Sequence, residues 1–232
     1  SFPEAVQMLT GEPGEAQPEA DPAPSPAFRL PLRNVTNANI LNYLTQERKL
    51  SPSLVNFFIA AGDIYEDAAH HNVVFVGRDA DGHPRYASSR GIREKFRKDA
   101  AGAEKAFGFA HRGIDKQLLV FEAPIDLLSF IELFPKNWQQ HNYLSLGGVS
   151  AKALQQFLSE RPDVERVFLC LDSDKAGEDA CKRLAALLPD SVSVTRIQPC
   201  MKDWNDVLMH RAEISNRNYF KSIVLKEPSK PE

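Results

Sequence analysis

The sequence predicts an α/β protein with a four-stranded parallel sheet flanked by helices, preceded by a small α+β subdomain. Two observations favour this fold. In residues 114–212, short apolar segments alternate with longer helical segments, which is the pattern of βαβ units and a parallel sheet. In residues 33–113, two helical segments precede a hairpin pattern. The chain has 232 residues, of which 43% are hydrophobic, so it is long enough to bury a core in each part.

Residues 1–32 are predicted to contain the end of a preceding region and a linker. Phe2–Leu9 has the composition of one short helix. Residues 11–28 are rich in Pro, Glu and Ala and contain no Lys or Arg, which favours an extended tether over a packed element. At the other end of the chain, residues 213–232 are predicted to form a tail with a loose end.

Two helices and a hairpin are predicted in residues 33–113. Apolar residues recur at helical spacing in residues 38–48. Ser51-Pro52 then supplies an N-cap and a first-turn residue for a second helix, which ends at Gly62. The hairpin has strands at residues 72–76 and 85–87, with Asp81-Gly82 in the connection.

Residues 85–98 are the strongly positive cluster of the chain. They contain six basic residues and one acid, Glu94. The net charge of the whole chain is −3, so a contact with nucleic acid requires a local patch of this kind. A solvated surface without a ligand is the alternative interpretation. The basic residues are Arg85, Arg90, Arg93, Lys95, Arg97 and Lys98.

Four strands and three helices are predicted in residues 114–212. The strands are expected at residues 117–121, 142–146, 166–171 and 191–197. The helices between them are expected at residues 123–134, 150–160 and 175–188. Helices that connect successive parallel strands form right-handed crossovers, so these segments predict one continuous parallel sheet.

Two of these strands end in acidic residues. Glu122 follows the first strand, and Asp172 and Asp174 follow the third. Because ligands gather at the carboxyl ends of parallel strands, these carboxylates converge if the two strands are neighbours. Mg²⁺ would relieve their repulsion and take its remaining ligands from water and substrate phosphate. Asp126, one helical turn after Glu122, is placed to act as a supporting or capping group. The alternative is that Asp172 and Asp174 only cap the next helix.

Three segments together resemble the Toprim domain shared by bacterial DNA primases, topoisomerases and some nucleases. They are residues 118–130 (LLVFEAPIDLLSF), 143–148 (YLSLGG) and 167–184 (VFLCLDSDKAGEDACKRL). The glutamate that ends the family's first strand is matched by Glu122, and the Asp-x-Asp pair after its third strand by Asp172 and Asp174. Gly177 matches the glycine that follows that pair.

A further acidic motif of primases is similar to residues 201–206 (MKDWND). The matching positions are Lys202, Asp203 and Asp206. One departure concerns the residue after the glutamate, which is often Gly in the family and is Ala123 in this chain. The resemblance therefore implies the fold more firmly than the activity.

The first half resembles the segment that precedes Toprim in bacterial primases. The similar segments are residues 43–62, 73–91 and 102–109. In primases this segment presents an arginine and a lysine to the nucleic acid or nucleotide, matched here by Arg90 and Lys105. Primase-like proteins of bacterial mobile elements pair this segment with Toprim in the same way. Residues 1–12 resemble the last helix after a primase zinc ribbon, which implies that the ribbon is missing from this fragment.

The resemblance implies a DNA primase-like nucleotidyltransferase in the DNA replication of a mobile element or plasmid. Its implied substrates are a single-stranded DNA template and nucleoside triphosphates, its cofactor is Mg²⁺ or Mn²⁺, and its partner is a helicase or another replication protein. The implied metal ligands, of which the first three are also catalytic, are Glu122, Asp172, Asp174, Asp203 and Asp206. The implied nucleic-acid or nucleotide-binding residues are Arg90, Arg93, Lys95, Arg97, Lys98, Lys105, Lys175 and Lys202.

Two other functions stay open. A Toprim nuclease would use the same metal to activate water, and a degenerate Toprim fold would serve as a non-catalytic nucleic-acid-binding or protein-docking module. The cellular location is predicted to be the cytoplasm. Three cysteines without paired spacing indicate a reducing compartment, and no apolar run is long enough to cross a bilayer.

Overall fold

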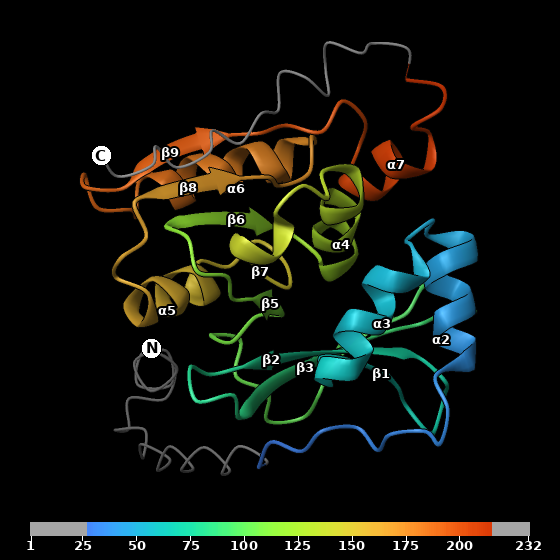
Figure 1. Ribbon diagram of the computed structural model, residues 1–232. Helices are drawn as coiled ribbons and strands as arrows, with labels where there is room; N and C mark the ends of the chain where they lie inside the picture. Colours follow the sequence, from blue (N-terminus) through green and yellow to red (C-terminus); the bar gives the residue numbers. More distant parts are fainter. Residues whose placement is uncertain (1–26, 215–232) are drawn as a thin grey trace, which may run out of the picture.

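The computed structural model describes residues 27–214, which form two β-sheets with helices packed against each (Figure 1). The first sheet and its helices come from the N-terminal half of the chain, and the second sheet lies above them in Figure 1. Three predictions fall outside the described residues: the helix at Phe2–Leu9, the acidic linker up to residue 26, and the tail beyond residue 214.

The first sheet is antiparallel, with the strand order β1-β2-β3-β4. Its strands are β1 (Ile64–Glu66), β2 (Val73–Arg78), β3 (Pro84–Arg90) and β4 (Arg97–Asp99). The β2–β3 pair confirms the predicted hairpin, and Gly82 in its turn has φ +82°, which favours glycine. Strands β1 and β4 were not predicted, because three residues carry too little alternation to be recognised.

Helices α2 and α3 cover one face of the first sheet (Figure 1). The chain enters α2 (Ala38–Asn42), continues as the π-helical turn η1 (Tyr43–Glu47), and then forms α3 (Pro52–Ala61). Both predicted ends of α3 are confirmed. The Ser51 hydroxyl accepts a hydrogen bond from Leu54 N, and Gly62 adopts φ +77° at the C-cap.

The second sheet has the strand order β5-β7-β6-β8-β9. Its strands are β5 (Ala110–His111), β6 (Gln117–Phe121), β7 (Asn142–Ser145), β8 (Arg166–Leu169) and β9 (Ser193–Arg196). Strands β6 to β9 are mutually parallel, which confirms the predicted four-stranded parallel sheet. The short strand β5 adds an antiparallel edge to β7 that was not predicted.

Helices alternate with the strands of the second sheet as predicted. The three predicted helices are α4 (Pro124–Leu133), α5 (Lys152–Glu160) and α6 (Lys175–Ala185), whereas the 3₁₀ turn η2 (Trp138–Gln140) and α7 (Trp204–Met209) were not predicted. Two ends were predicted two or more residues too far along the chain: β8 ends at Leu169 and α6 at Ala185. Because β8 ends at Leu169, the acidic residues Asp172 and Asp174 lie beyond the end of the strand.

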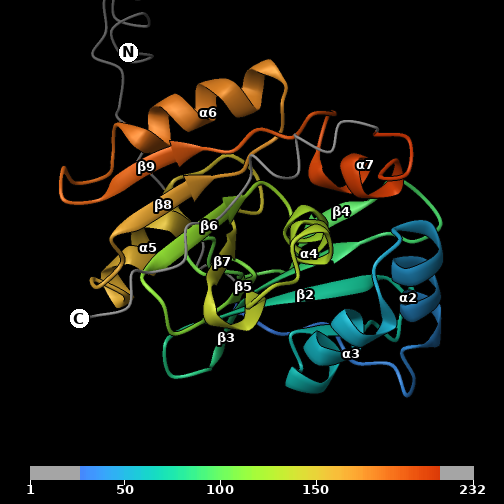
Figure 2. The ribbon, with the colours of Figure 1, turned by 45° about the horizontal axis from the view of Figure 1, so that its top comes forward.

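Alternate residues of β6 pack into two different cores. Leu118 and Val120 belong to a cluster with α5 and α6. Leu119 and Phe121 belong to a second cluster, which includes α4, α7 and the inner face of the first sheet. Because this second cluster contains residues from both halves, one continuous core fixes the two sheets relative to each other. Figures 1 and 2 show α4 and α7 on the side nearer to α2 and α3.

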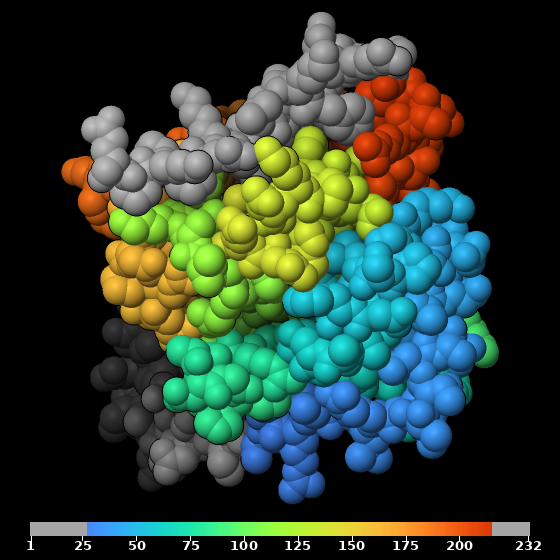
Figure 3. Space-filling model, in the orientation of Figure 1, coloured from blue at the N-terminus to red at the C-terminus, as the bar shows by residue number. Residues whose placement is uncertain are grey.

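The contact between the halves is also visible on the surface. On the face shown in Figure 3, α3 lies directly against the segment that contains α4 and η2. The rings of Phe57 and Trp138 meet there edge to face, with centroids 4.9 Å apart. None of the helices between residues 27 and 214 combines the length and the apolar composition that a membrane crossing needs.

Candidate functional site

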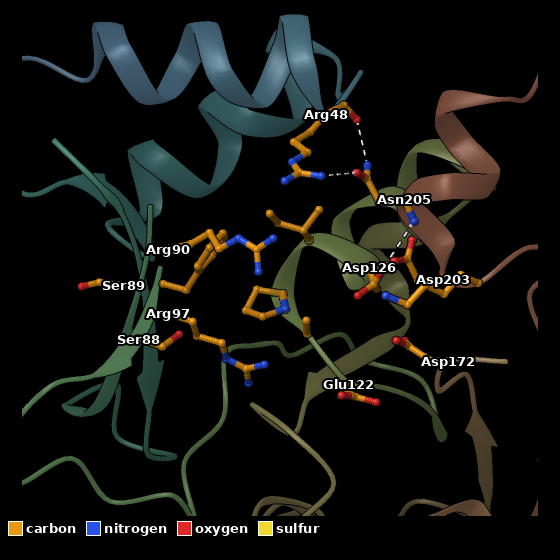
Figure 4. A pocket seen from close by; sticks show the side chains of 15 residues that line it. Arg48, Ser88, Ser89, Arg90, Arg97, Glu122, Asp126, Asp172, Asp203 and Asn205 are labelled. Atoms are coloured by element: carbon orange, nitrogen blue, oxygen red, sulfur yellow. Dashed lines mark hydrogen bonds between the residues drawn. The ribbon is translucent and has the colours of Figure 1, made fainter. Parts of the chain in front are cut away.

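A cleft of about 270 Å³ lies where the carboxyl ends of β6 and β8 face strands β3 and β4 (Figure 4). Its two sides differ in charge. The acidic side carries Glu122, Asp126, Asp172 and Asp203, together with Lys202. The opposite side carries Arg48, Arg90 and Arg97.

Strand pairing brings Glu122 and Asp172 to the same edge of the second sheet. Strands β6 and β8 are parallel neighbours, with Val120 opposite Leu169. Glu122 and Asp172 follow these paired residues at the carboxyl ends, which confirms that the two strands are adjacent. Ala123 has φ −130°, an extended conformation that any residue adopts, so this position does not require the glycine common in the family.

The acidic side is electrostatically uncompensated. Burial and the neighbouring Asp174 carboxylate raise the pKa of Glu122, although Arg97 and Lys202 act in the opposite direction. Burial, Glu122 and Asp203 raise the pKa of Asp172 to about 7. Asp126 is only 7% exposed, and its burial together with Asp203 and Asp172 raises its pKa well above the ordinary value. A cation at this side of the cleft would therefore relieve repulsion that Arg97 and Lys202 offset only in part.

Asp172 has a carboxylate oxygen that is available to a ligand. Its Oδ1 atom is buried and has no hydrogen-bond partner among the described residues. An unpaired buried carboxylate oxygen is costly, and a bound cation would satisfy it. The backbone around it is tightly built: a Cβ at Gly177 would lie 2.3 Å from the Asp172 carbonyl oxygen, which explains why glycine stands there.

The carboxylates of the cleft fit Mg²⁺ better than a metal that needs a complete protein cage. Within residues 27–214, the group of three potential ligands whose atoms all lie within 4.8 Å of one another is Asp79, Asp81 and His83, in the exposed β2–β3 turn. Glu122, Asp172 and Asp174 are spaced more widely. Mg²⁺ typically uses one or two protein carboxylates and keeps waters or phosphate oxygens as its other ligands, so the wider spacing suits it.

Two of the predicted metal ligands also cap helices. Asp174 accepts a hydrogen bond from Gly177 N at 2.9 Å, at the start of α6. Asp203 accepts one from Asp206 N at 2.8 Å, at the start of α7. The capping interpretation is therefore confirmed for Asp174, whose second carboxylate oxygen takes no part in the cap. Asp206 lies in the first turn of α7 and does not line the cleft.

Arg90 and Arg97 form an unusual pair on the basic side. They lie directly opposite each other on β3 and β4. Like charges in this position destabilise a sheet. Neither guanidinium forms a hydrogen bond or ion pair within residues 27–214, and no acid separates them. Such a pair is suited to an anion, and Figure 4 shows both side chains directed into the cleft.

Five other predicted basic residues lie outside the lining of this cleft. Lys105 pairs with Asp99 at 3.0 Å, and Lys175 pairs with Asp179 at 3.4 Å on the exposed surface of α6. Three others, all exposed, are Arg93, Lys95 and Lys98. Lys202 lines the cleft, beside the acids.

Arg48 and Asn205 are among the cleft residues that the prediction from sequence missed. Arg48 follows the π-helical turn η1, and a sequence pattern does not distinguish such a turn from an ordinary helix end. Asn205 was passed over inside the MKDWND motif, where only the charged residues were considered. The position of Asn205 between Asp203 and Asp206 was the feature of the sequence that could have identified it as a cleft residue.

Family comparisons agree with the two halves of the chain. Residues 119–208 match a family described as Toprim-like. Residues 42–116 match a family described as a protein of unknown function, DUF3991.

Curated relatives are similar over part of their length. An uncharacterised protein of Bacillus anthracis is 28% identical over 158 residues, which are 61% of this chain and 45% of the relative. An uncharacterised protein of Mycoplasma pneumoniae is 27% identical over 128 residues, which are 51% of this chain and 58% of the relative. The chain thus spans about half the length of the curated relatives it matches.

Solved structures with a similar fold are primase cores. The primase fragment of the bacteriophage T7 primase-helicase protein superposes with a TM-score of 0.61 at 19% identity, covering 89% of this chain and 82% of that chain. The DnaG primase catalytic domain bound to single-stranded DNA gives a TM-score of 0.54 at 16% identity, covering 82% and 75%. At these identities the likeness establishes the fold. Residues 119–208 therefore match a Toprim-like family, and the chain has the fold of primase catalytic cores.

Proposed function

We propose that the cleft catalyses primase-type nucleotidyl transfer, in which nucleoside triphosphates are joined on a single-stranded DNA template. The observation that carries the proposal is the arrangement of charge. Carboxylates with raised pKa values face Arg90 and Arg97, which form no ion pair within residues 27–214, across one cleft on the fold of primase cores. A complex of a divalent cation with a triphosphate presents both charges that such a cleft requires.

In this proposal the acidic side holds the metal. Asp172, through its unpartnered Oδ1, and Glu122 bind Mg²⁺ or Mn²⁺, and Asp203 and the free oxygen of Asp174 complete the negative field. When bound, the metal neutralises triphosphate charge and aligns the attacking 3′-hydroxyl for in-line displacement. Asp206, outside the cleft lining, stays a predicted ligand.

The basic side binds phosphate. Arg90 and Arg97 reach the cleft from neighbouring strands and can share one phosphate group or two adjacent ones. Lys202 lies beside the acids, where it limits their repulsion. The exposed residues Arg93, Lys95 and Lys98 continue the positive charge beyond the cleft, along the connection from β3 to β4 and onto β4. A template strand would pass along these residues.

The test is primer synthesis on single-stranded DNA with nucleoside triphosphates and either Mg²⁺ or Mn²⁺. Asp172→Asn should reduce synthesis by about a hundredfold or more, because the metal supplies several kcal/mol of charge stabilisation. Asp179→Asn, on the surface of α6, is the matched control and should leave the rate unchanged. Metal-dependent synthesis that survives Asp172→Asn would remove this aspartate from the mechanism.

The same assay separates the alternatives. Metal-dependent cutting of labelled DNA without added nucleotides would assign the cleft to a nuclease. DNA binding without either reaction, and without stabilisation by metal, would indicate a non-catalytic module. A cytoplasmic location, a helicase partner and a role in mobile-element replication belong to the same proposal and depend on its outcome.

A further inference from the structure

We propose that Asn205 is a positioning residue that holds the Arg48 guanidinium in the cleft as a third phosphate-binding group. The inference rests on the proposed function for the nature of the ligand, a polyphosphate. It concerns two residues, 157 positions apart, that the structure brings into direct contact. Figure 4 shows Arg48 and Asn205 side by side at the edge of the cleft.

The Asn205 side chain is 4% exposed and uses both ends of its amide. Its Oδ1 accepts a hydrogen bond from Arg48 Nη1 at 3.1 Å, and its Nδ2 donates to the Arg48 carbonyl oxygen at 3.0 Å. Arg48 is therefore held at its side chain and at its backbone by one residue. Nδ2 also donates to Ser129 Oγ at 3.0 Å, which anchors the amide to α4.

The backbone of Asn205 connects this contact to the acidic side. Asn205 N donates a hydrogen bond to Asp126 Oδ1 at 3.2 Å. Asn205 follows Trp204, the first residue of α7, and this short helix is capped by Asp203 of the acidic side. The same turn of chain therefore fixes a carboxylate on one side of the cleft and an arginine on the other.

A second contact, to Tyr43, leaves one guanidinium nitrogen of Arg48 available for a ligand. Its Nε donates to the Tyr43 hydroxyl at 2.8 Å, and its guanidinium lies over the Tyr43 ring, 5.1 Å from the centroid. With Nε and Nη1 engaged, Nη2 forms no hydrogen bond within residues 27–214. A guanidinium held at two nitrogens loses little freedom when the third binds a phosphate oxygen.

The backbone around Arg48 adopts rare conformations. Tyr43–Glu47 is a π-helical turn, in which Arg48 N donates to the Tyr43 carbonyl oxygen at 3.1 Å. Lys49, the next residue, has φ +60°, a costly value for lysine. Such strained backbone is typical of functional sites, and here the bond from Asn205 Nδ2 to the Arg48 carbonyl stabilises it.

The amide is the group that this position requires. Asn205→Asp keeps the shape and the acceptor for Nη1, but it removes the donor and places a carboxylate oxygen against the Arg48 carbonyl. Asn205→Ala removes both contacts. Ser129→Ala is the matched control, because it takes away the other partner of Nδ2 without touching Arg48.

The experiment measures inorganic tripolyphosphate binding to the 232-residue chain by calorimetry, with Mg²⁺ present so that the acidic side is neutralised. Arg48→Ala should weaken binding by roughly tenfold, the usual effect of losing one charge-assisted hydrogen bond. Asn205→Ala should weaken it about three- to tenfold. In the Arg48→Ala background, Asn205→Ala should cause less than about a twofold further loss, because its effect passes through Arg48. Ser129→Ala should change the unfolding midpoint and leave the affinity unchanged.

Three results would overturn the inference. They are no binding by the wild-type chain, an additive effect of the two substitutions, or an affinity loss in Ser129→Ala that equals that of Asn205→Ala. Variants that fail to fold are identified by circular dichroism, and Asn205→Leu, which preserves side-chain volume and removes both contacts to Arg48, then takes the place of Asn205→Ala. Failure of the proposed function is a separate outcome, in which tripolyphosphate binds with this pattern but no primer is made.

Discussion

Replacing Asp172 with Asn should have opposite effects on the stability of the protein with and without divalent metal. Without metal, the ionised Asp172 carboxylate is a source of strain, because burial and the neighbouring acids Glu122 and Asp203 raise its pKa from 3.8 to about 7. With metal, the same carboxylate becomes a ligand. Asn removes both the strain and the ligand, so the two effects can be measured on one variant.

The magnitude follows from linkage. A carboxyl group whose pKa is raised on folding contributes its stability below the ordinary pKa, and this contribution is lost as the pH rises through about 7. The full shift corresponds to about 4 kcal/mol. Solvent screening at this half-buried group reduces it to on the order of 1–2 kcal/mol. At pH 8, metal-free Asp172→Asn should therefore unfold several degrees above the wild type, and the difference should shrink toward pH 5.

Thermal unfolding at pH 5, 6, 7 and 8, with EDTA or with millimolar MgCl₂, tests both effects. Mg²⁺ at a hundred times its dissociation constant should stabilise the wild type by about 2.7 kcal/mol at pH 8, and Asp172→Asn by much less. Asp179→Asn is the control and should follow the wild type in every condition. If metal-free Asp172→Asn is less stable than the wild type at pH 8, or if it keeps the full Mg²⁺ response, the interpretation of the acidic side is wrong.

Two further substitutions test the backbone and the basic side of the cleft. Gly177→Ala should lower the free energy of unfolding by roughly 1–3 kcal/mol in urea titrations, because the new Cβ would lie 2.3 Å from the rigid Asp172 carbonyl oxygen. The control is Ala176→Ser, at the exposed neighbouring position, which should leave the free energy of unfolding unchanged. Arg97→Gln should weaken the binding of tripolyphosphate in the presence of Mg²⁺ by roughly tenfold, the share of one charge-assisted contact. An unchanged affinity, or an equal loss with the control Arg183→Gln on α6, would contradict a role of Arg97 in phosphate binding.

The elements that the sequence predicted are those with a strong local signal. Strand β6 is buried on both faces and therefore has a continuous apolar run, and α3 has a recognisable cap at each end. The convergence of Glu122 and Asp172 was predicted on the condition that their strands are neighbours, and the pairing of β6 with β8 meets that condition. The shared edge of these two carboxylates was thus predictable from where the apolar runs end, once the two strands are paired.

The residues that were missed depend on tertiary contacts. Arg48 enters the cleft only because Asn205 and Tyr43 hold it, and Asn205 lies 157 positions further along the chain. The short strand β5 is defined only by its pairing with β7. No periodicity records such contacts, because they arise from the packing of one half of the chain against the other.

The charge pattern of the cleft explains why its two sides must come from different sheets. The carboxylates follow parallel strands of the second sheet, whereas Arg90 and Arg97 stand on antiparallel strands of the first. Direct pairing of these arginines with the carboxylates would neutralise both, and neither charge would be available to a ligand. Instead the acids keep raised pKa values, and the two arginines form no hydrogen bond or ion pair within the described part of the chain. The core shared by the two sheets holds these opposite charges apart at a fixed separation, which a ligand carrying both a cation and phosphate groups can span.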